Sequence, residues 1–296
     1  MKVKGIDKVC VVGAGTMGHQ IALCAALAGY QVKCNDINEK ILEKARLFME
    51  KYLPDRVAKG KMTEDAACAG KENISFTSNL EEAASDADLV IEVIPEVLAL
   101  KRKMFARLDK ICPKQTLLVT NSSFIVTSRL ADVTGRPEKL CNMHFFVPPL
   151  AMLPVEVVKG PHTSTETVNT IADVCKSMGK IPIMLDKEIH GFLVNRILSI
   201  VQREALFLYD TGVASFKDID IAVKEGLGHK ISPFYQMDLI GLDLVLLISM
   251  EHYRETGNPE YKPSPAVIDM VAKNRLGRKT GQGFYDYSDM LNERGY

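Results

Sequence analysis

The 296-residue sequence lacks tryptophan and has no excess of either charge, because 37 lysines and arginines balance 37 aspartates and glutamates. A balanced chain produces no overall field that would attract nucleic acid or an acidic surface. No apolar run approaches the length of a membrane-spanning helix, and the first residues lack the apolar core of a secretory signal. We therefore expect a cytoplasmic protein with neither a nucleic-acid nor a membrane partner.

Cysteine pairs with the spacing of a metal or redox site are also missing. None of the seven cysteines belongs to a Cys-x-x-Cys pair, and most lie inside apolar runs. An odd number of scattered thiols is typical of a reducing compartment and not of a disulfide framework. We predict buried free thiols, no disulfide and no metal site.

A glycine-rich motif follows the first apolar run of the chain. Residues 8–12 are typical of a buried parallel strand, residues 13–18 read Gly-Ala-Gly-Thr-Met-Gly, and a helical pattern begins directly afterwards. Such glycines let the backbone approach a pyrophosphate, and the helix N-terminus offers free N–H groups. Asp36, at the end of the next predicted strand, suits a ribose with two free hydroxyls and repels a 2′-phosphate. The motif predicts an NAD site, the alternative being a glycine-rich turn without a ligand. The residues assigned to the cofactor here are Gly13, Gly15, Thr16, Met17, Gly18 and Asp36.

Strand and helix patterns alternate up to about residue 187, whereas only helical patterns follow. Predicted strands cover 8–12, 31–36, 74–77, 89–93, 116–119, 140–143, 155–158 and 181–185. Predicted helices of the later part cover 192–209, 217–225, 233–250 and 266–273. The sequence therefore predicts an α/β protein with a Rossmann-type doubly wound sheet in residues 1–187 and a smaller all-helical domain in residues 188–296.

One histidine and one carboxylate stand on either side of a rigid turn. His144 follows an apolar run, Pro148 and Pro149 force a turn, and Glu156 lies in the returning strand-like run 155–158. A strand, turn and returning strand can bring the two side chains face to face as a proton-transfer pair working near neutral pH. The alternative is that His144 caps a strand and Glu156 faces solvent.

Further polar residues fall at the carboxyl ends of predicted strands, where open α/β sheets bind ligands. Each alone could be a turn or cap residue, but their shared position favours a site. They are Glu96, Asn121, Ser122, Ser123 and His144. A basic segment also follows the second strand, and it suits either a phosphorylated substrate or a solvated helix face. Its residues are Lys44, Arg46, Lys51, Arg56, Lys59 and Lys61.

Together these stretches resemble the L-3-hydroxyacyl-CoA dehydrogenase family, in particular its short bacterial 3-hydroxybutyryl-CoA dehydrogenases, over nearly the whole chain. The matching stretches are 11–18, 90–92 with Pro95-Glu96, 120–123, Met143-His144-Phe145-Phe146, 191–196, Gly241-Leu242-Asp243 and 276–285. The resemblance implies reversible, NAD-dependent oxidation of the 3-hydroxyl of a short 3-hydroxyacyl-CoA to the 3-ketoacyl-CoA by a homodimer that is joined mainly through its helical domain.

The resemblance also assigns roles to single residues. It implies that His144 is the catalytic base, that Glu156 orients it, that Ser123 binds the substrate oxygen and that Asn195 lies near the reacting carbonyl. On the cofactor side it implies Glu96, Lys101, Ser123 and Lys279. For coenzyme A it implies Tyr52 and Lys59.

Two positions depart from the family pattern towards apolar residues. Val147 stands where the family has asparagine after His-Phe-Phe, which removes a donor and an acceptor. Phe124 stands where the family has a small polar residue after Ser122-Ser123. These departures leave room for a different acyl group, for a hydroxy acid or alcohol without coenzyme A, or for an NAD-binding protein without turnover.

Overall fold

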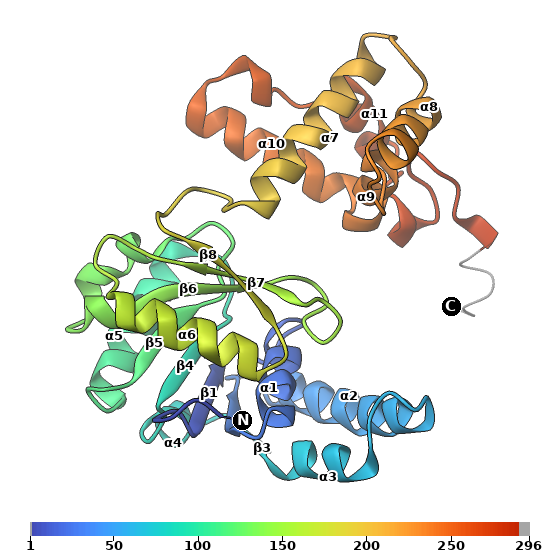
Figure 1. The fold of residues 1–296 in the computed structure, drawn as a ribbon. Helices are drawn as coiled ribbons and strands as arrows, with labels where there is room; N and C mark the ends of the chain where they lie inside the picture. The colour runs from blue at the N-terminus through green and yellow to red at the C-terminus, as the bar shows by residue number, and fades with distance from the viewer. Residues whose placement is uncertain (1, 290–296) are drawn as a thin grey trace. The chain divides into compact units, whose positions relative to one another are not determined.

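The computed structural model describes residues 2–289, which form two compact units (Figure 1). The first unit ends at Leu193 and the second begins at Val194. Residues 188–193, which we expected to open the helical domain, therefore pack with the first unit. The architecture is the predicted one, a Rossmann-type α/β unit followed by a smaller helical unit.

The first unit is built on one eight-stranded sheet in the order β3-β2-β1-β4-β5-β6-β7-β8. Strands β1 to β6 are parallel to one another, β7 is antiparallel to β6, and β8 is parallel to β7. The strands are β1 Lys8–Val12, β2 Gln31–Asn35, β3 Ile74–Thr77, β4 Leu89–Glu92, β5 Leu117–Thr120, β6 Leu140–Phe145, β7 Pro154–Val158 and β8 Ile181–Leu185. The sequence places all eight, with shifts of a residue or two at their ends.

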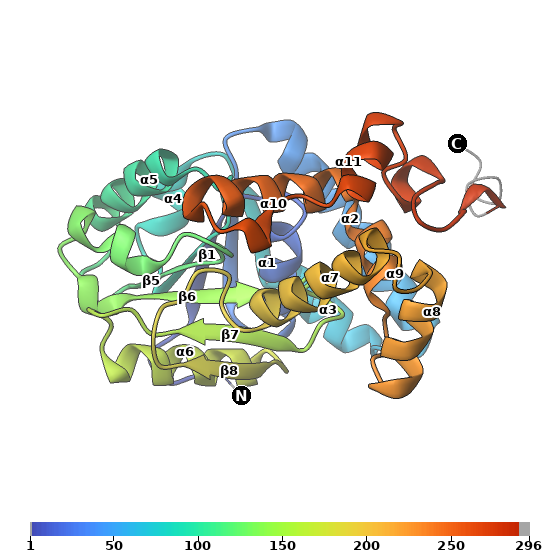
Figure 2. The ribbon, with the colours of Figure 1, turned by 90° about the horizontal axis from the view of Figure 1, so that it is seen from above.

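Helices cover both faces of this sheet (Figure 2). They are α1 Gly18–Leu27, α2 Glu39–Ala58, α3 Glu64–Glu72, α4 Leu80–Ala84, α5 Leu98–Ile111 and α6 Thr165–Ser177. The side chains of Asn38, Thr63 and Ser164 cap the first turns of α2, α3 and α6, which is why these helices begin where they do. Helix α4 has only five residues, so its apolar repeat is too short to be recognised in the sequence.

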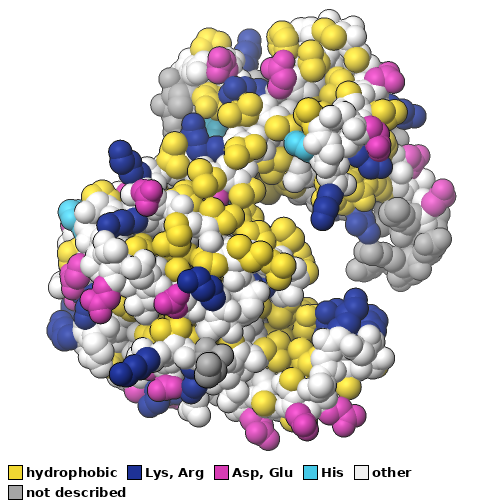
Figure 3. All heavy atoms as spheres, viewed as in Figure 1, with side chains coloured by type: hydrophobic (Ala, Val, Ile, Leu, Met, Phe, Trp, Pro, Cys, Tyr) yellow, Lys and Arg dark blue, Asp and Glu magenta, His cyan; other side chains and the backbone are white. Residues whose placement is uncertain are grey.

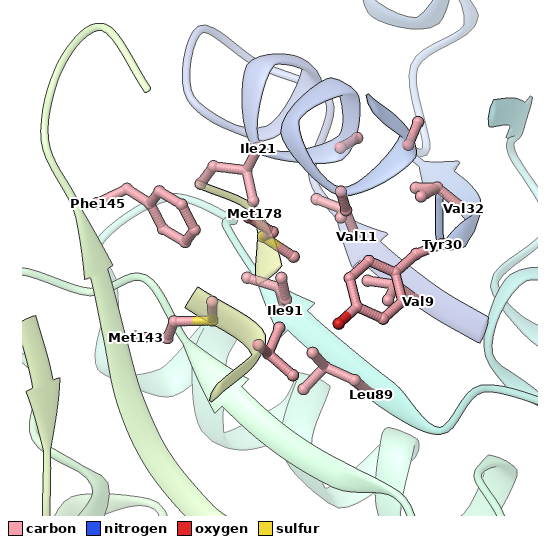
Figure 4. Close-up of a cluster of buried hydrophobic side chains, with 14 of the residues drawn as sticks. Val9, Val11, Ile21, Tyr30, Val32, Leu89, Ile91, Met143, Phe145 and Met178 are labelled. Carbon is pink, nitrogen blue, oxygen red and sulfur yellow. The ribbon is translucent and has the colours of Figure 1, made fainter. Parts of the chain in front are cut away.

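Successive residues of β1 supply two separate cores. Val9 and Val11 pack with α1 and α6 on one face, where Figure 4 shows Ile21 and Met178 beside them. Cys10 and Val12 pack with α4 and α5 on the other face. Because strand side chains alternate between faces, a run that is apolar at every position is required when both faces are covered.

The second unit consists of helices α7 Val194–Asp210, α8 Phe216–Ile221, α9 Pro233–Ile240, α10 Leu242–Thr256 and α11 Pro265–Ala272. The prediction of one helix over residues 233–250 is wrong, because the chain turns by 97° between α9 and α10. Gly241 stands at this break with φ +105°, a conformation that other residues rarely adopt. Within residues 2–289 no single helix has the length and composition to cross a membrane, and α9 and α10 meet that test only as a bent pair.

One cysteine departs from the expectation of buried thiols. Six of the seven are buried, and burial raises the pKa of Cys24 and Cys112 to about 11 and that of Cys34 to about 12. Cys68 is exposed, since the only residue that α3 buries is Gly70. All seven thiols are free.

Candidate active site

The candidate site residues of the first unit lie at the carboxyl ends of neighbouring strands. Strand β1 pairs with β2 on one side and with β4 on the other, so the chain reverses its direction of winding between β1 and β4. Ligands of open α/β sheets bind in the crevice at such a point. Gly13 follows β1, Asp36 follows β2, Glu92 ends β4, and Ser123 follows β5.

In the glycine loop, residues 13–18, the protein leaves no room for a side chain at two of the three glycines and leaves open space at the third. A Cβ at Gly13 would lie 2.6 Å from the carbonyl oxygen of Val93, and a Cβ at Gly18 would lie 1.7 Å from that of Gly13. A Cβ at Gly15 would meet no protein atom within 4 Å. Asp36 is fixed beside the loop, because its carboxylate accepts the N–H of Ala14 at 3.0 Å. The open space at Gly15 fits a cofactor phosphate that must approach the backbone closely.

This difference predicts opposite effects of two alanine substitutions. Gly15→Ala should change the free energy of unfolding by less than about 0.5 kcal/mol, yet weaken NADH binding on the order of tenfold. Gly18→Ala should lower the free energy of unfolding by about 3 kcal/mol or more, because the added methyl overlaps a backbone carbonyl. Thermal unfolding and NADH fluorescence titration of the two variants check this. Equal effects of both variants on unfolding would contradict it.

His144 lies between a carboxylate and a hydroxyl. Strands β6 and β7 pair with His144 directly opposite Glu156. His144 Nδ1 is 2.8 Å from Glu156 Oε2, and His144 Nε2 is 2.9 Å from Ser123 Oγ. A carboxylate only accepts hydrogen bonds, so Nδ1 carries the proton and the lone pair of Nε2 accepts the Ser123 hydroxyl. The pair is buried, with His144 4% and Glu156 0% exposed. The structure thus brings together the three residues that the sequence proposed.

Residues that the sequence reasoning missed complete the surroundings of the imidazole. The rings of Phe146 and Phe192 lie 4.9 Å and 5.4 Å from the His144 ring. The N–H of Leu193 donates to Glu156 Oε1 at 3.0 Å, which leaves Oε2 to face the histidine. Phe192 is fully buried with φ +50°, a strained backbone for a bulky residue. In the sequence, the Gly-Phe-Leu motif at residues 191–193 was the signal that could have indicated these residues. Only the fold shows that Phe192 packs against His144.

Glu96 and Lys101 lie close together beside the Ser123 loop. Lys101, on α5, is 1% exposed and its Nζ lies 3.3 Å from Glu96 Oε2. Glu96 Oε1 accepts the hydroxyl of Ser122 and the backbone N–H groups of Phe124 and Ile125. Lys101 Nζ also lies 2.7 Å from Glu92, so both predicted cofactor side chains lie near the carboxyl end of β4.

Tyr52 lies on α2, and Lys59 is the residue that follows the end of this helix. Tyr52 stacks on Phe48 with ring centroids 5.5 Å apart, and Phe48 in turn meets His19 at 4.5 Å. His19 Nδ1 lies 2.6 Å from the carbonyl oxygen of Gly15, so this row of rings leads from the glycine loop to Tyr52. Lys59 is exposed and pairs with Asp55 at 2.8 Å.

Asn195 and Lys279 belong to the second unit. Asn195 is in the first turn of α7, and Lys279 pairs with Asp243 at the start of α10, which lowers the pKa of Asp243. Of the two departures from the family pattern, Val147 is 66% exposed in the loop after β6. Phe124 is half-buried and its ring lies 5.1 Å from that of His190.

Comparisons with known proteins show the family of this chain. The family models for the NAD-binding domain and the C-terminal domain of 3-hydroxyacyl-CoA dehydrogenase match residues 8–189 and 191–287. The mitochondrial hydroxyacyl-coenzyme A dehydrogenase of Mus musculus is 40% identical over 290 residues, covering 95% of this chain and 91% of its own. The 3-hydroxybutyryl-CoA dehydrogenase of Clostridioides difficile is 39% identical over 281 residues, covering 95% and 99%.

A solved structure is similar over the same extent. The (S)-3-hydroxybutyryl-CoA dehydrogenase of Ralstonia eutropha has a TM-score of 0.88 at 36% identity and covers 95% of this chain and 99% of its own. Both the resemblance inferred from the sequence and the NAD cofactor are thereby confirmed. The chain belongs to the 3-hydroxyacyl-CoA dehydrogenase family of NAD-dependent oxidoreductases.

Proposed function

We propose that this protein oxidises the 3-hydroxyl of a short, 3-hydroxybutyryl-like acyl-CoA to the 3-ketone, reversibly, with His144 as the general base. The observation that carries the proposal is the row Ser123–His144–Glu156, with its 2.9 Å and 2.8 Å contacts and its buried imidazole and carboxylate. A secondary alcohol is a weak acid, so its oxidation near neutral pH requires a base within hydrogen-bond reach. NAD, when bound, accepts the hydride that leaves C3.

The three side chains divide the work of proton transfer. Nε2 of His144 takes the hydroxyl proton, because Nδ1 already carries one. Glu156 keeps the imidazole in this tautomer and stabilises the imidazolium that forms. The Ser123 hydroxyl lies close enough to Nε2 to bind the same substrate oxygen and stabilise its developing charge. Phe146 and Phe192 line two sides of the imidazole and limit the access of water to it.

Helix α2 supplies a site for the coenzyme A part of the substrate. Tyr52 and Lys59 are the contacts that the family resemblance implies, and Arg56 lies over the Tyr52 ring at 5.7 Å. Figure 3 shows basic side chains gathered beside α2. Lysine and arginine side chains suit the phosphates of coenzyme A.

The remaining roles follow the resemblance. Glu96, Lys101 and Lys279 serve the cofactor, Asn195 lies near the reacting carbonyl, and the nucleotide site belongs to residues 1–187. The helical unit that begins at Val194 provides substrate and dimer contacts in a cytoplasmic homodimer. Figure 3 shows hydrophobic side chains on the surface of the helical unit, as a dimer face requires. Exposed apolar residues of α7 and α10 include Ile197, Ile200, Phe207, Leu244, Leu247 and Met250.

A second candidate is the oxidation of another hydroxy compound on the same scaffold. Val147 and Phe124 favour it, because both replace polar family residues close in sequence to His144 and Ser123. An apolar replacement removes hydrogen bonds without removing the His144–Glu156 pair. The experiment must therefore decide which acyl group the substrate carries and whether the substrate contains coenzyme A.

A steady-state substrate panel with NAD tests the proposal. We expect turnover of 3-hydroxybutyryl-CoA and competitive inhibition by adenosine 3′-phosphate, which resembles the adenosine end of coenzyme A. Lys59→Ala should weaken that inhibition, whereas Lys71→Ala, an exposed lysine on α3, should leave it unchanged. Turnover of free hydroxy acids without inhibition by adenosine 3′-phosphate would overturn the coenzyme A assignment. Binding of NAD without turnover of any panel member would leave only an NAD-binding protein.

A further inference from the structure

Glu92, the last residue of β4, is a fully buried carboxylate. Its Oε1 accepts two hydrogen bonds of 2.7 Å, one from Nζ of Lys101 and one from the N–H of Ile94. Its Oε2 accepts the hydroxyl of Thr120 at 2.7 Å. Burial raises the pKa of Glu92, while Lys101 and these hydrogen bonds act in the opposite direction. A buried charge is costly unless such partners compensate it, so its presence at the carboxyl edge of the sheet needs a reason.

Two routes lead from Glu92 to the residue before Ser123. In the first route, Glu92 holds Lys101, Lys101 pairs with Glu96, and Glu96 accepts the Ser122 hydroxyl. Glu96 also accepts the N–H groups of the two residues after Ser123, so the loop is bound on both sides of that serine.

In the second route, Thr120 connects Glu92 directly to the loop. The Thr120 hydroxyl has one proton and gives it to Glu92, because an ionised carboxylate cannot donate. Its oxygen is then free to accept the N–H of Ser122 at 3.1 Å. Loss of the negative charge at Glu92 would remove this orientation of the hydroxyl.

We infer that Glu92 is a positioning residue that holds the Ser123 hydroxyl at its hydrogen-bonding distance from His144. Glu92 does this through Lys101 and Glu96 on one side and through Thr120 on the other. The inference rests on the role proposed above for Ser123. It explains why an ion pair is buried at this strand end, where an apolar pair of the same size would fill the space equally well.

A double-mutant cycle between Glu92 and Ser123 tests the inference in the full-length protein. Glu92→Gln alone should lower kcat for 3-hydroxybutyryl-CoA about tenfold to a hundredfold, because small displacements of a reacting group are costly. In a Ser123→Ala background, Glu92→Gln should change kcat by less than about twofold, since the hydroxyl it positions is already gone. The acid limb of the kcat/KM pH profile should move in the same direction in Glu92→Gln as in Ser123→Ala.

Asp238→Asn is the matched control, because Asp238 is a fully buried carboxylate of the second unit that accepts two backbone N–H groups and a tyrosine hydroxyl. Any effect of Asp238→Asn on kcat should be equal with and without Ser123. If Glu92→Gln does not fold, Thr120→Val takes its place in the same cycle, and Thr120→Ser should restore activity.

The outcomes separate the inference from the proposed function. Equal effects of the Glu92 or Thr120 variant in both backgrounds would overturn the positioning role. An unchanged kcat in Ser123→Ala itself would instead overturn the proposed role of Ser123.

Discussion

Replacing His144 by alanine should lower kcat by about 10²–10⁴, because the substrate hydroxyl loses its proton acceptor. NADH binding should stay within about twofold of the unaltered protein, since the glycine loop and Asp36 follow β1 and β2, whereas His144 lies on β6. Stopped-flow or steady-state turnover together with NADH fluorescence titration measures both quantities.

Two further variants make this result interpretable. His162→Ala removes an exposed histidine of the same chain and should leave turnover unchanged. His144→Gln keeps more of the side-chain volume between Phe146 and Phe192, so its loss of activity cannot be attributed to a cavity. Turnover retained in both His144 variants would exclude His144 as the base.

Glu156→Gln should lower kcat by as much as about 10⁴, because it changes the tautomer of His144. The N–H of Leu193 donates to Oε1, so the amide oxygen of the glutamine takes that place. The amide NH₂ then faces Nδ1, which can accept it only by giving up its own proton. The proton moves to Nε2, and the nitrogen that should act as the base becomes a donor.

Nitrogen NMR of histidine-labelled protein measures this tautomer directly. Glu156→Asp is the control, because a shorter carboxylate still only accepts hydrogen bonds and should preserve the Nδ1–H form with a smaller loss of kcat. A Glu156→Gln variant that loses activity while Nδ1 keeps its proton would show that the carboxylate acts by charge alone.

Local patterns predicted the central strands β1, β4 and β5 because each is apolar at all but one position, as a strand covered on both faces requires. The same reasoning failed at residues 233–250, where the apolar pattern continues through Gly241 although the chain turns by 97° there. It also failed at Cys68, whose exposure depends on how α3 packs and not on its neighbours in sequence. Helix α4 escaped recognition because one short turn carries too few apolar residues.

The sequence by itself determined the α/β class, the NAD loop and the identity of the His144, Glu156 and Ser123 side chains, because these depend on residue type and spacing along the chain. Only the tertiary structure decided how these side chains meet. The antiparallel register of β6 and β7 sets His144 opposite Glu156, and the N–H of Leu193, 37 residues further along, selects the carboxylate oxygen that faces it. The tertiary structure likewise decided the buried Glu92–Lys101 ion pair. Glu92 ends β4 and Lys101 lies on α5, and no sequence pattern indicated that the two side chains would meet.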